Sequence, residues 1–155
     1  MHTNRRFLVK AALAGVWASL AGKWILFKPR QAYGFWPEPP FKAKTPAEVI
    51  AALHKGSVAI VSDRIQIEAP DLAEDGTVVP VKIRAELTGV ESISIIAEKN
   101  PVPLVACFKL SPDVIPSIAT RIKLAGSSHM IALVEAQGKL YTRSKFVKVV
   151  QGGCG

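Results

Sequence analysis

Apolar and polar residues alternate in short runs along most of the chain after Ser57. In the longest run, residues 79–87, every odd position is apolar and every even position holds proline or a charged residue. This period of two predicts a strand with one face in a core and the other in water. Shorter runs of the same kind predict further strands at residues 65–68, 90–96, 104–110, 120–124, 130–135 and 146–150.

Clusters of turn-forming residues separate these runs. Short strands repeated about every ten residues, with a turn signal between them, predict an all-β domain. We expect a single antiparallel immunoglobulin-like β-sandwich, with a barrel as the structural alternative. Strands do not alternate with helices here, which disfavours a doubly wound nucleotide-binding fold. The turn signals lie at residues 74–76, 100–101, 111–113, 126–128 and 137–139.

One helix is predicted before the strands. Thr45 is a suitable N-cap, Pro46 suits the first helical position, and Glu48 completes a capping box. Apolar residues then recur on one face over two to three turns until Gly56, which predicts the end of the helix. The preceding residues 35–44 are rich in proline, and we expect them to be extended.

The N-terminal segment has the pattern of an export signal. Arg5 and Arg6 stand before an apolar pair and a lysine, as in the twin-arginine motif, and the apolar stretch 11–22 follows. Because that stretch is short and rich in Ala and Gly, we interpret it as a signal peptide, with an N-terminal anchor helix as the alternative. We therefore expect export to the periplasm by the twin-arginine translocase. Small-x-small cleavage patterns occur at residues 19–21 and 32–34, of which we favour the second.

The net charge of +8 would fit a partner such as nucleic acid, but its distribution argues against one. Residues 1–32 contain six basic residues and no acidic residue. The remainder has fourteen basic against twelve acidic residues, without a basic stripe interleaved with aromatics. We therefore expect no nucleic-acid binding.

Motifs for catalysis, metals and cofactors are missing from the sequence. Two cysteines, Cys107 and Cys154, are too few for a disulfide framework, and no CxxC or CxxCH motif occurs. Neither G-x-S-x-G, H-E-x-x-H nor a phosphate-binding glycine loop is present. Asp71, Glu74 and Asp75 surround Gly76, but an acidic turn is usually solvated, so we predict no metal site and no catalytic residue.

The last residues, Gln151-Gly-Gly-Cys-Gly155, combine flexibility with a reactive group. Glycine reaches most of φ/ψ space and occupies little room, so Gly152, Gly153 and Gly155 would let Cys154 enter a narrow cleft. A cysteine thiolate can form a reversible S–S bond with a sulfur compound. We interpret residues 151–155 as a flexible arm that carries a covalent attachment site.

Other interpretations of Cys154 remain open: a chance cysteine, a site of intermolecular disulfide formation, or the nucleophile of a thiol enzyme. A structural β-sandwich protein of the periplasm with an incidental thiol is the alternative function. Prenylation is excluded, because it needs cysteine fourth from the end and Cys154 is second from the end. The expected division of the chain is a signal peptide at 1–34, a Pro-rich segment with a helix at 35–56, the sandwich at 57–150 and the arm at 151–155.

Several motifs together resemble the SoxY family, the sulfur-carrying subunits of the SoxYZ complex in bacterial thiosulfate oxidation. The resemblance covers roughly Ile65 to the end, and its most specific part is the tail. The motifs are Ile67-Glu-Ala-Pro70, Glu74-Asp-Gly76 with Val79-Pro-Val81, Glu98-Lys-Asn-Pro-Val-Pro103, Phe108-Lys-Leu-Ser-Pro112, Thr120-Arg-Ile-Lys123, and Val147-Lys-Val149 leading to Gly152-Gly-Cys-Gly155.

The resemblance implies that Cys154 is the covalent carrier site and that the chain is not itself an enzyme. In that family a haem enzyme conjugates the tail cysteine with thiosulfate, and partner enzymes oxidise and hydrolyse the bound sulfur. The resemblance also implies a heterodimer with a second β-sandwich subunit, SoxZ, and no cofactor beyond the sulfur intermediates.

The chain departs from the family pattern at two points. The usual tail has one more glycine after the position of Gly155, so we expect the terminal carboxylate to disfavour the thiolate of Cys154. A second cysteine, Cys107, is not needed by the family. We expect Cys107 to be a small apolar residue, partly buried or covered by the partner subunit, that shares a strand face with Val105 and Lys109, with a redox role toward Cys154 as the alternative.

Overall fold

The structure, a computed structural model, describes residues 38–54 and 57–151 of the chain. They belong to one structural unit that begins at Pro37. The helices are α2 (Glu38–Lys42) and α3 (Pro46–His54). The strands are β1 (Ile60–Val61), β2 (Ile65–Glu68), β3 (Leu72–Asp75), β4 (Val79–Ala85), β5 (Val90–Ala97), β6 (Leu104–Lys109), β7 (Ser117–Ile122), β8 (Ser128–Ala136) and β9 (Lys139–Gln151).

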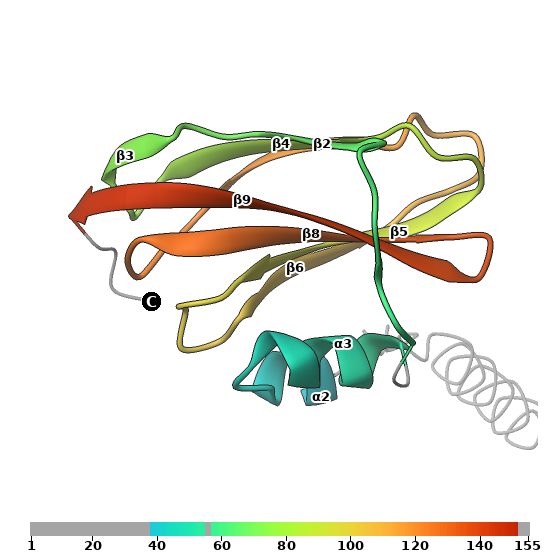
Figure 1. Cartoon of the computed structure of the whole chain (residues 1–155), viewed down its shortest axis with the longest axis horizontal. Helices are drawn as coiled ribbons and strands as arrows, with labels where there is room; N and C mark the ends of the chain where they lie inside the picture. Colours follow the sequence, from blue (N-terminus) through green and yellow to red (C-terminus); the bar gives the residue numbers. More distant parts are fainter. Residues whose placement is uncertain (1–37, 55–56, 152–155) are drawn as a thin grey trace, which may run out of the picture. The chain divides into compact units, whose positions relative to one another are not determined.

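The strands form two facing sheets (Figure 1). One has the order β1-β9-β8-β5-β6, with β3 also paired to β9, and the other has the order β2-β4-β7. The long strand pairs are antiparallel, and only β1 and β3 run parallel to β9. The predicted immunoglobulin-like β-sandwich is thereby confirmed, with two short parallel pairings that a period of two does not reveal.

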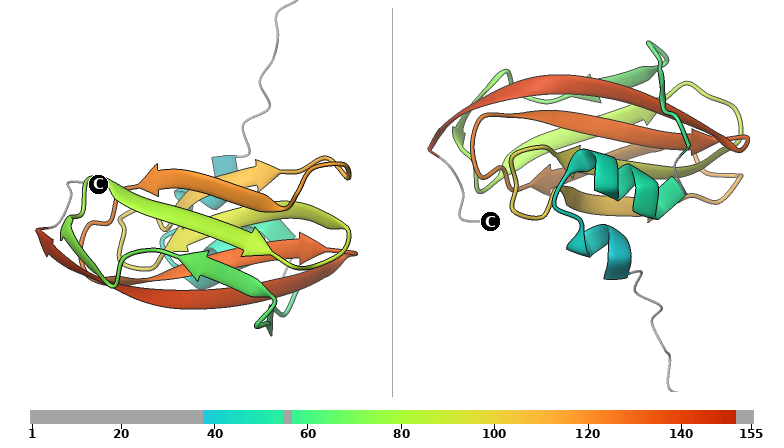
Figure 2. Two further views of the ribbon diagram at one scale, coloured as in Figure 1. Left: turned by 90° about the horizontal axis from the view of Figure 1, so that it is seen from above. Right: turned by 60° about the horizontal axis from the view of Figure 1, so that its bottom comes forward.

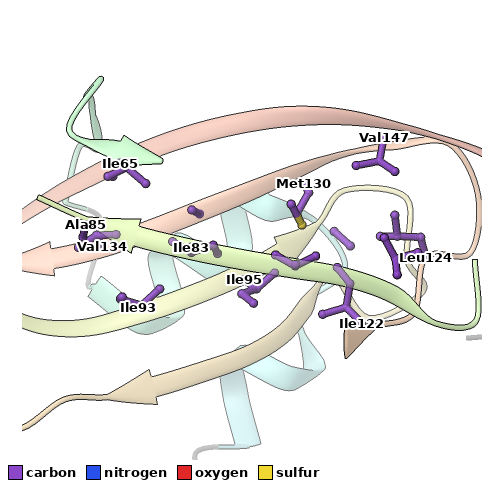
Figure 3. Close-up of a cluster of buried hydrophobic side chains, with 14 of the residues drawn as sticks. Ile65, Ile83, Ala85, Ile93, Ile95, Ile122, Leu124, Met130, Val134 and Val147 are labelled. Atoms are coloured by element: carbon purple, nitrogen blue, oxygen red, sulfur yellow. The ribbon is translucent and has the colours of Figure 1, made fainter. Parts of the chain in front are cut away.

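The main core fills the space between the sheets (Figure 3). Strand β4 follows the predicted alternation, with its odd positions buried and Pro80 and Arg84 exposed. Facing strands add their inward residues, and each fully buried aliphatic side chain stabilises the fold by roughly 1.5–3 kcal/mol. Large core side chains include those of Ile65, Ile83, Ile93, Ile95, Leu124, Met130, Val134 and Val147.

The helices cover the outer face of the larger sheet (Figure 2). Val49 of α3 is fully buried against a second cluster that includes Ile96 of β5 and Leu133 of β8. As a result β5 is buried on both faces, with only Glu91 exposed. The sequence predicts a half-buried strand here, because it does not show where the helices pack.

The predicted start of α3 is confirmed in detail. The Thr45 hydroxyl accepts a hydrogen bond from the backbone N–H of Glu48 at 3.2 Å. The Glu48 carboxylate accepts one from the backbone N–H of Lys44 at 2.8 Å, one residue earlier than in the standard capping box. Gly56, the predicted stop, lies outside the described residues, and His54 is the last residue of the helix.

The expectation of extended structure in the Pro-rich segment is wrong over residues 38–42, which form α2. Pro39 and Pro40 stand in the first turn of this helix. At that position a missing N–H costs no intrahelical hydrogen bond, and the fixed φ of proline suits a helix. Neither of the helices that the structure describes is long and apolar enough to span a bilayer.

Candidate functional site

The residues of the predicted carrier site lie outside the described part of the chain. They are Cys154 and the glycines Gly152, Gly153 and Gly155; Arg5 and Arg6 of the export motif lie outside it as well. The structure describes the chain as far as Gln151, the last residue of β9. It therefore defines the base from which residues 152–155 start, and we call residues 148–151 the arm root.

The arm root is held by strand β3. Beyond Val147, β9 leaves β8 and pairs in parallel with β3, with Lys148 opposite Leu72 and Gln151 opposite Asp75. The backbone N–H of Gly76 donates to the carbonyl of Gln151 at 2.8 Å, and that of Lys148 donates to the carbonyl of Asp71 at 2.9 Å. The last described residue is therefore fixed by backbone hydrogen bonds.

Side chains from the neighbouring loops also hold the arm root. The Ser127 hydroxyl accepts from the backbone N–H of Val149 at 2.9 Å and donates to the Val149 carbonyl at 3.3 Å. The Asn100 side chain donates to the carbonyl of Lys123 and accepts from the N–H of Ala125, both at 2.9 Å. Asn100 belongs to one of the SoxY-like motifs, and this geometry gives it a structural role, because it fixes the loop that carries Ser127.

Asp75 forms the turn next to the arm root. Its carboxylate accepts hydrogen bonds at 2.7 Å from both the backbone N–H and the hydroxyl of Thr77. These two hydrogen bonds, the backbone one first, lower the pKa of Asp75 below its usual value. Asp71 instead pairs with Lys145 at 3.0 Å. Within residues 38–54 and 57–151, His, Cys, Asp and Glu side chains form no group of three or more suited to a metal ion.

Cys107 is exposed on the edge strand β6, so it is not partly buried within this chain, and cover by a partner subunit stays a prediction. A β-bulge between Ile95 and Ile96 shifts the pairing of β5 with β6. As a consequence Leu104 joins the cluster under the helices, whereas Val105 packs against the core between the sheets. Cys107 therefore shares a face with Lys109, as predicted, whereas Val105 lies on the opposite face.

A pocket of about 310 Å³ lies beside Cys107, against the C-terminal end of α3. His54 lines it, and only 9% of the His54 side chain is exposed. The His54 Nδ1 atom lies 3.7 Å from Oε2 of Glu135, the same oxygen that accepts a hydrogen bond from the Ser92 hydroxyl at 3.2 Å. The other residues around the pocket are Leu53, Glu91 and Lys109.

Sequence reasoning misses this second cluster. His54, Ser92, Cys107 and Glu135 are widely separated in the chain and belong to four different elements. The pairing of β6 with β5 and of β5 with β8 places three of these elements side by side, and the packing of α3 adds the fourth. The residues carry no spacing motif, and only the fold brings them together.

Comparison with known proteins agrees with the class indicated by the fold and the tail, a β-sandwich with a cysteine shortly after its last strand. The family described as "Sulfur oxidation protein SoxY" matches residues 50–154. The chain belongs to the SoxY family of sulfur oxidation proteins, which confirms the resemblance found in the sequence.

A solved structure, the sulfur carrier protein SoxY from Chlorobium limicola f thiosulfatophilum, is 36% identical to the chain, with a TM-score of 0.65. The alignment covers 74% of this chain and 99% of that one. A chain from a structure of T cell activation by toxic shock syndrome toxin-1 is 14% identical, with a TM-score of 0.38, over 55% of this chain and 98% of that one. A likeness at this level has no bearing on function. A search of curated protein sequences gave no match.

Proposed function

We propose that the chain is a periplasmic sulfur carrier of thiosulfate oxidation, which binds sulfur intermediates covalently on Cys154 and presents them to partner enzymes. The observation behind this proposal is the family match, which extends to residue 154 and so includes the cysteine. The related Chlorobium protein is itself described as a sulfur carrier.

The chemistry of a carrier thiol is simple to balance. The thiolate of Cys154 and thiosulfate form a new S–S bond, which gives a cysteine S-thiosulfonate and releases two electrons. We assign the acceptor of those electrons to a haem-containing partner enzyme. A hydrolytic partner then adds water across the terminal S–S bond, which releases sulfate and leaves a persulfide on the cysteine. The carrier supplies the thiol in this scheme and the partners supply the catalysis.

The arm root supports this division of labour. A carrier needs a fixed base and a thiol that reaches into another protein's cleft. Gln151 is held by Gly76 and by the pairing of β9 with β3. From there, three residues span at most about 11 Å, enough to carry a thiol beyond the surface of the sandwich.

A partner subunit is part of the proposal. Large apolar side chains remain exposed on the described unit, among them Val58, Val61, Ile115 and Val150. Such side chains are ordinary when scattered singly, so the partner is inferred from the SoxY family, whose members pair with a second subunit. We infer a heterodimer with a SoxZ-like β-sandwich subunit, and we expect the chain expressed alone to self-associate. A monomer that stays soluble at high concentration would contradict this inference.

The experiment that tests the carrier site compares the two cysteines as a matched pair. Cys154→Ala should abolish the mass adduct that forms when the chain is incubated with thiosulfate and the partner haem enzyme, whereas Cys107→Ala should keep it. The melting temperature of Cys154→Ala should remain that of the wild type, because a terminal segment contributes little to packing. An adduct that persists in Cys154→Ala would refute the assignment.

Export is tested separately. Replacing both Arg5 and Arg6 with Lys should leave the uncleaved precursor in the cytoplasm, as judged by fractionation and intact mass. A single Lys23→Gln change, in the same segment but outside the motif, serves as the control and should still be exported. Export of the double variant at the wild-type level would contradict the twin-arginine assignment.

A further inference from the structure

We propose that Cys107 is a second thiol site, independent of Cys154, at which a small disulfide exchanges within the pocket against α3. A nucleophile, a histidine and a carboxylate lie around this one cavity. The site does not depend on the proposed carrier function, since no residue of the arm takes part.

The nucleophile is accessible. Cys107 is exposed on β6, which forms one edge of the larger sheet. The pocket of about 310 Å³ beside it is large enough for a molecule such as 2-hydroxyethyl disulfide. Lys109, Glu91 and Glu135 surround the same space, so the pocket has charges of both signs. This environment fits a neutral or zwitterionic disulfide better than a multiply charged anion.

The histidine is held in place. His54 is nearly buried, and the Glu135 carboxylate beside its Nδ1 is itself fixed by the Ser92 hydroxyl. A base oriented by a third group is the arrangement that activates hydroxyl and thiol nucleophiles in enzymes. In this pocket the imidazole of His54 is the group available to accept the proton of Cys107, and Glu135 fixes its orientation.

A buried hydroxyl lies on the strand next to Cys107. Ser94 is the cross-strand partner of Cys107, so both side chains lie on the same face of the sheet. The Ser94 hydroxyl is fully buried and has no hydrogen-bond partner among the described residues. A buried hydroxyl without a hydrogen-bond partner is destabilising. Ser94 is not among the residues that line the pocket, so the exchange depends on Cys107, His54 and Glu135.

The exchange balances without an external oxidant. The Cys107 thiolate attacks one sulfur of the disulfide, a bond forms between that sulfur and Sγ, and the original S–S bond breaks. The leaving thiolate takes up the proton that His54 accepted. Each turnover therefore converts one disulfide and one thiol into a mixed disulfide and a free thiol.

The test uses the full chain with Cys154→Ala, which removes the arm thiol. After incubation with 2-hydroxyethyl disulfide, intact mass should show one mercaptoethanol adduct, and peptide mapping should place it on Cys107. The additional change Cys107→Ser should abolish it. The folded protein should react faster than the same protein unfolded in urea, because only the folded state assembles the pocket. An equal or slower rate in the folded state would overturn the proposal.

The role of His54 is tested against a matched histidine. Adding His54→Gln should slow adduct formation by about tenfold, a conservative fraction of what a positioned acid–base group contributes. Adding His129→Gln, a change at an exposed histidine on another part of the sheet, should leave the rate unchanged. Glu135→Gln should slow the reaction without removing a side chain, which keeps the test valid if His54→Gln fails to fold. If His54→Gln or Glu135→Gln reacts at the parent rate in a folded protein, the proposal is wrong.

Discussion

Asp75 links the charge of a single residue to the stability of the arm root. The pKa of Asp75 is lower in the folded state than its unfolded value of 3.8. The carboxylate therefore stabilises the fold at pH values above 3.8, and this stabilisation is lost as the pH falls through the lower pKa of the folded state. We expect Asp75→Ala to unfold more easily than the wild type at neutral pH, with the difference disappearing in strong acid. Urea unfolding at a series of pH values measures this.

The control for Asp75 is Asp113→Ala, a change at an exposed carboxylate in the turn between β6 and β7. It should leave the pH dependence of unfolding as in the wild type. A difference between Asp75→Ala and wild type that stays constant down to the lowest pH would show that the carboxylate charge is not the cause.

Asn100 has a larger expected effect, because both of its hydrogen bonds reach the backbone of another loop. Asn100→Ala should lower the free energy of unfolding by about 1–3 kcal/mol, since it leaves a partly buried N–H at Ala125 without its acceptor. Asn100→Asp keeps the acceptor for Ala125 but loses the donor to Lys123. Its free energy of unfolding should therefore lie between those of Asn100→Ala and the wild type. Equal stability of all three proteins in urea would contradict the role assigned to Asn100.

At the scale of elements, local chemistry predicts much of the fold. The capping residues Thr45 and Glu48 and the alternation in β4 are local signals, and both predictions are confirmed. The burial of β5 on both faces is not predictable in this way, because it depends on helices that lie more than thirty residues earlier in the chain. The parallel pairing of β1 and β3 with β9 is likewise set by tertiary contacts, since a strand's period does not encode its partner's direction.

The packing of α3 on the sheet yields a prediction with a matched control. Val49 of α3 is fully buried where the helix packs on the sheet, whereas Val58 is 87% exposed. Val49→Ala removes two methyl groups from a packed site and should cost about 2 kcal/mol, at roughly 0.8 kcal/mol for each buried carbon plus a cavity term. Val58→Ala should change stability by less than about 0.5 kcal/mol. Equal unfolding midpoints for the two variants would mean that α3 does not stabilise the sandwich.

Across the whole molecule, the two cysteines illustrate what a sequence can and cannot predict about a site. Cys154 stands out because of its glycine neighbours and its family motif, both of which are local. The pocket beside Cys107 has no such signal, because its members come from four elements that only the fold assembles. The sequence also leaves open whether the two thiols can react with each other, and the strand register leads to a prediction.

Strand register places Cys107 far from Gln151, the residue at which the arm begins. Cys107 is level with Thr142 of β9, because Cys107 pairs with Ser94, Ser94 with Leu133, and Leu133 with Thr142. Gln151 lies nine residues beyond Thr142, which is about 30 Å along a strand. The three residues from Gln151 to Cys154 recover at most about 11 Å, and a disulfide needs its two Cα atoms within about 7 Å.

We therefore predict that oxidation does not join Cys107 to Cys154 within one molecule. With the thiol oxidant diamide at low protein concentration, the monomer should keep the mass of the dithiol or gain adducts. Disulfides between chains should appear only as the concentration rises, and the variants Cys107→Ala and Cys154→Ala should each still form one kind of linked dimer. A monomer that loses two hydrogens, with a peptide linking the two cysteines, would show that β9 detaches from the sandwich and that the arm root is not a fixed base.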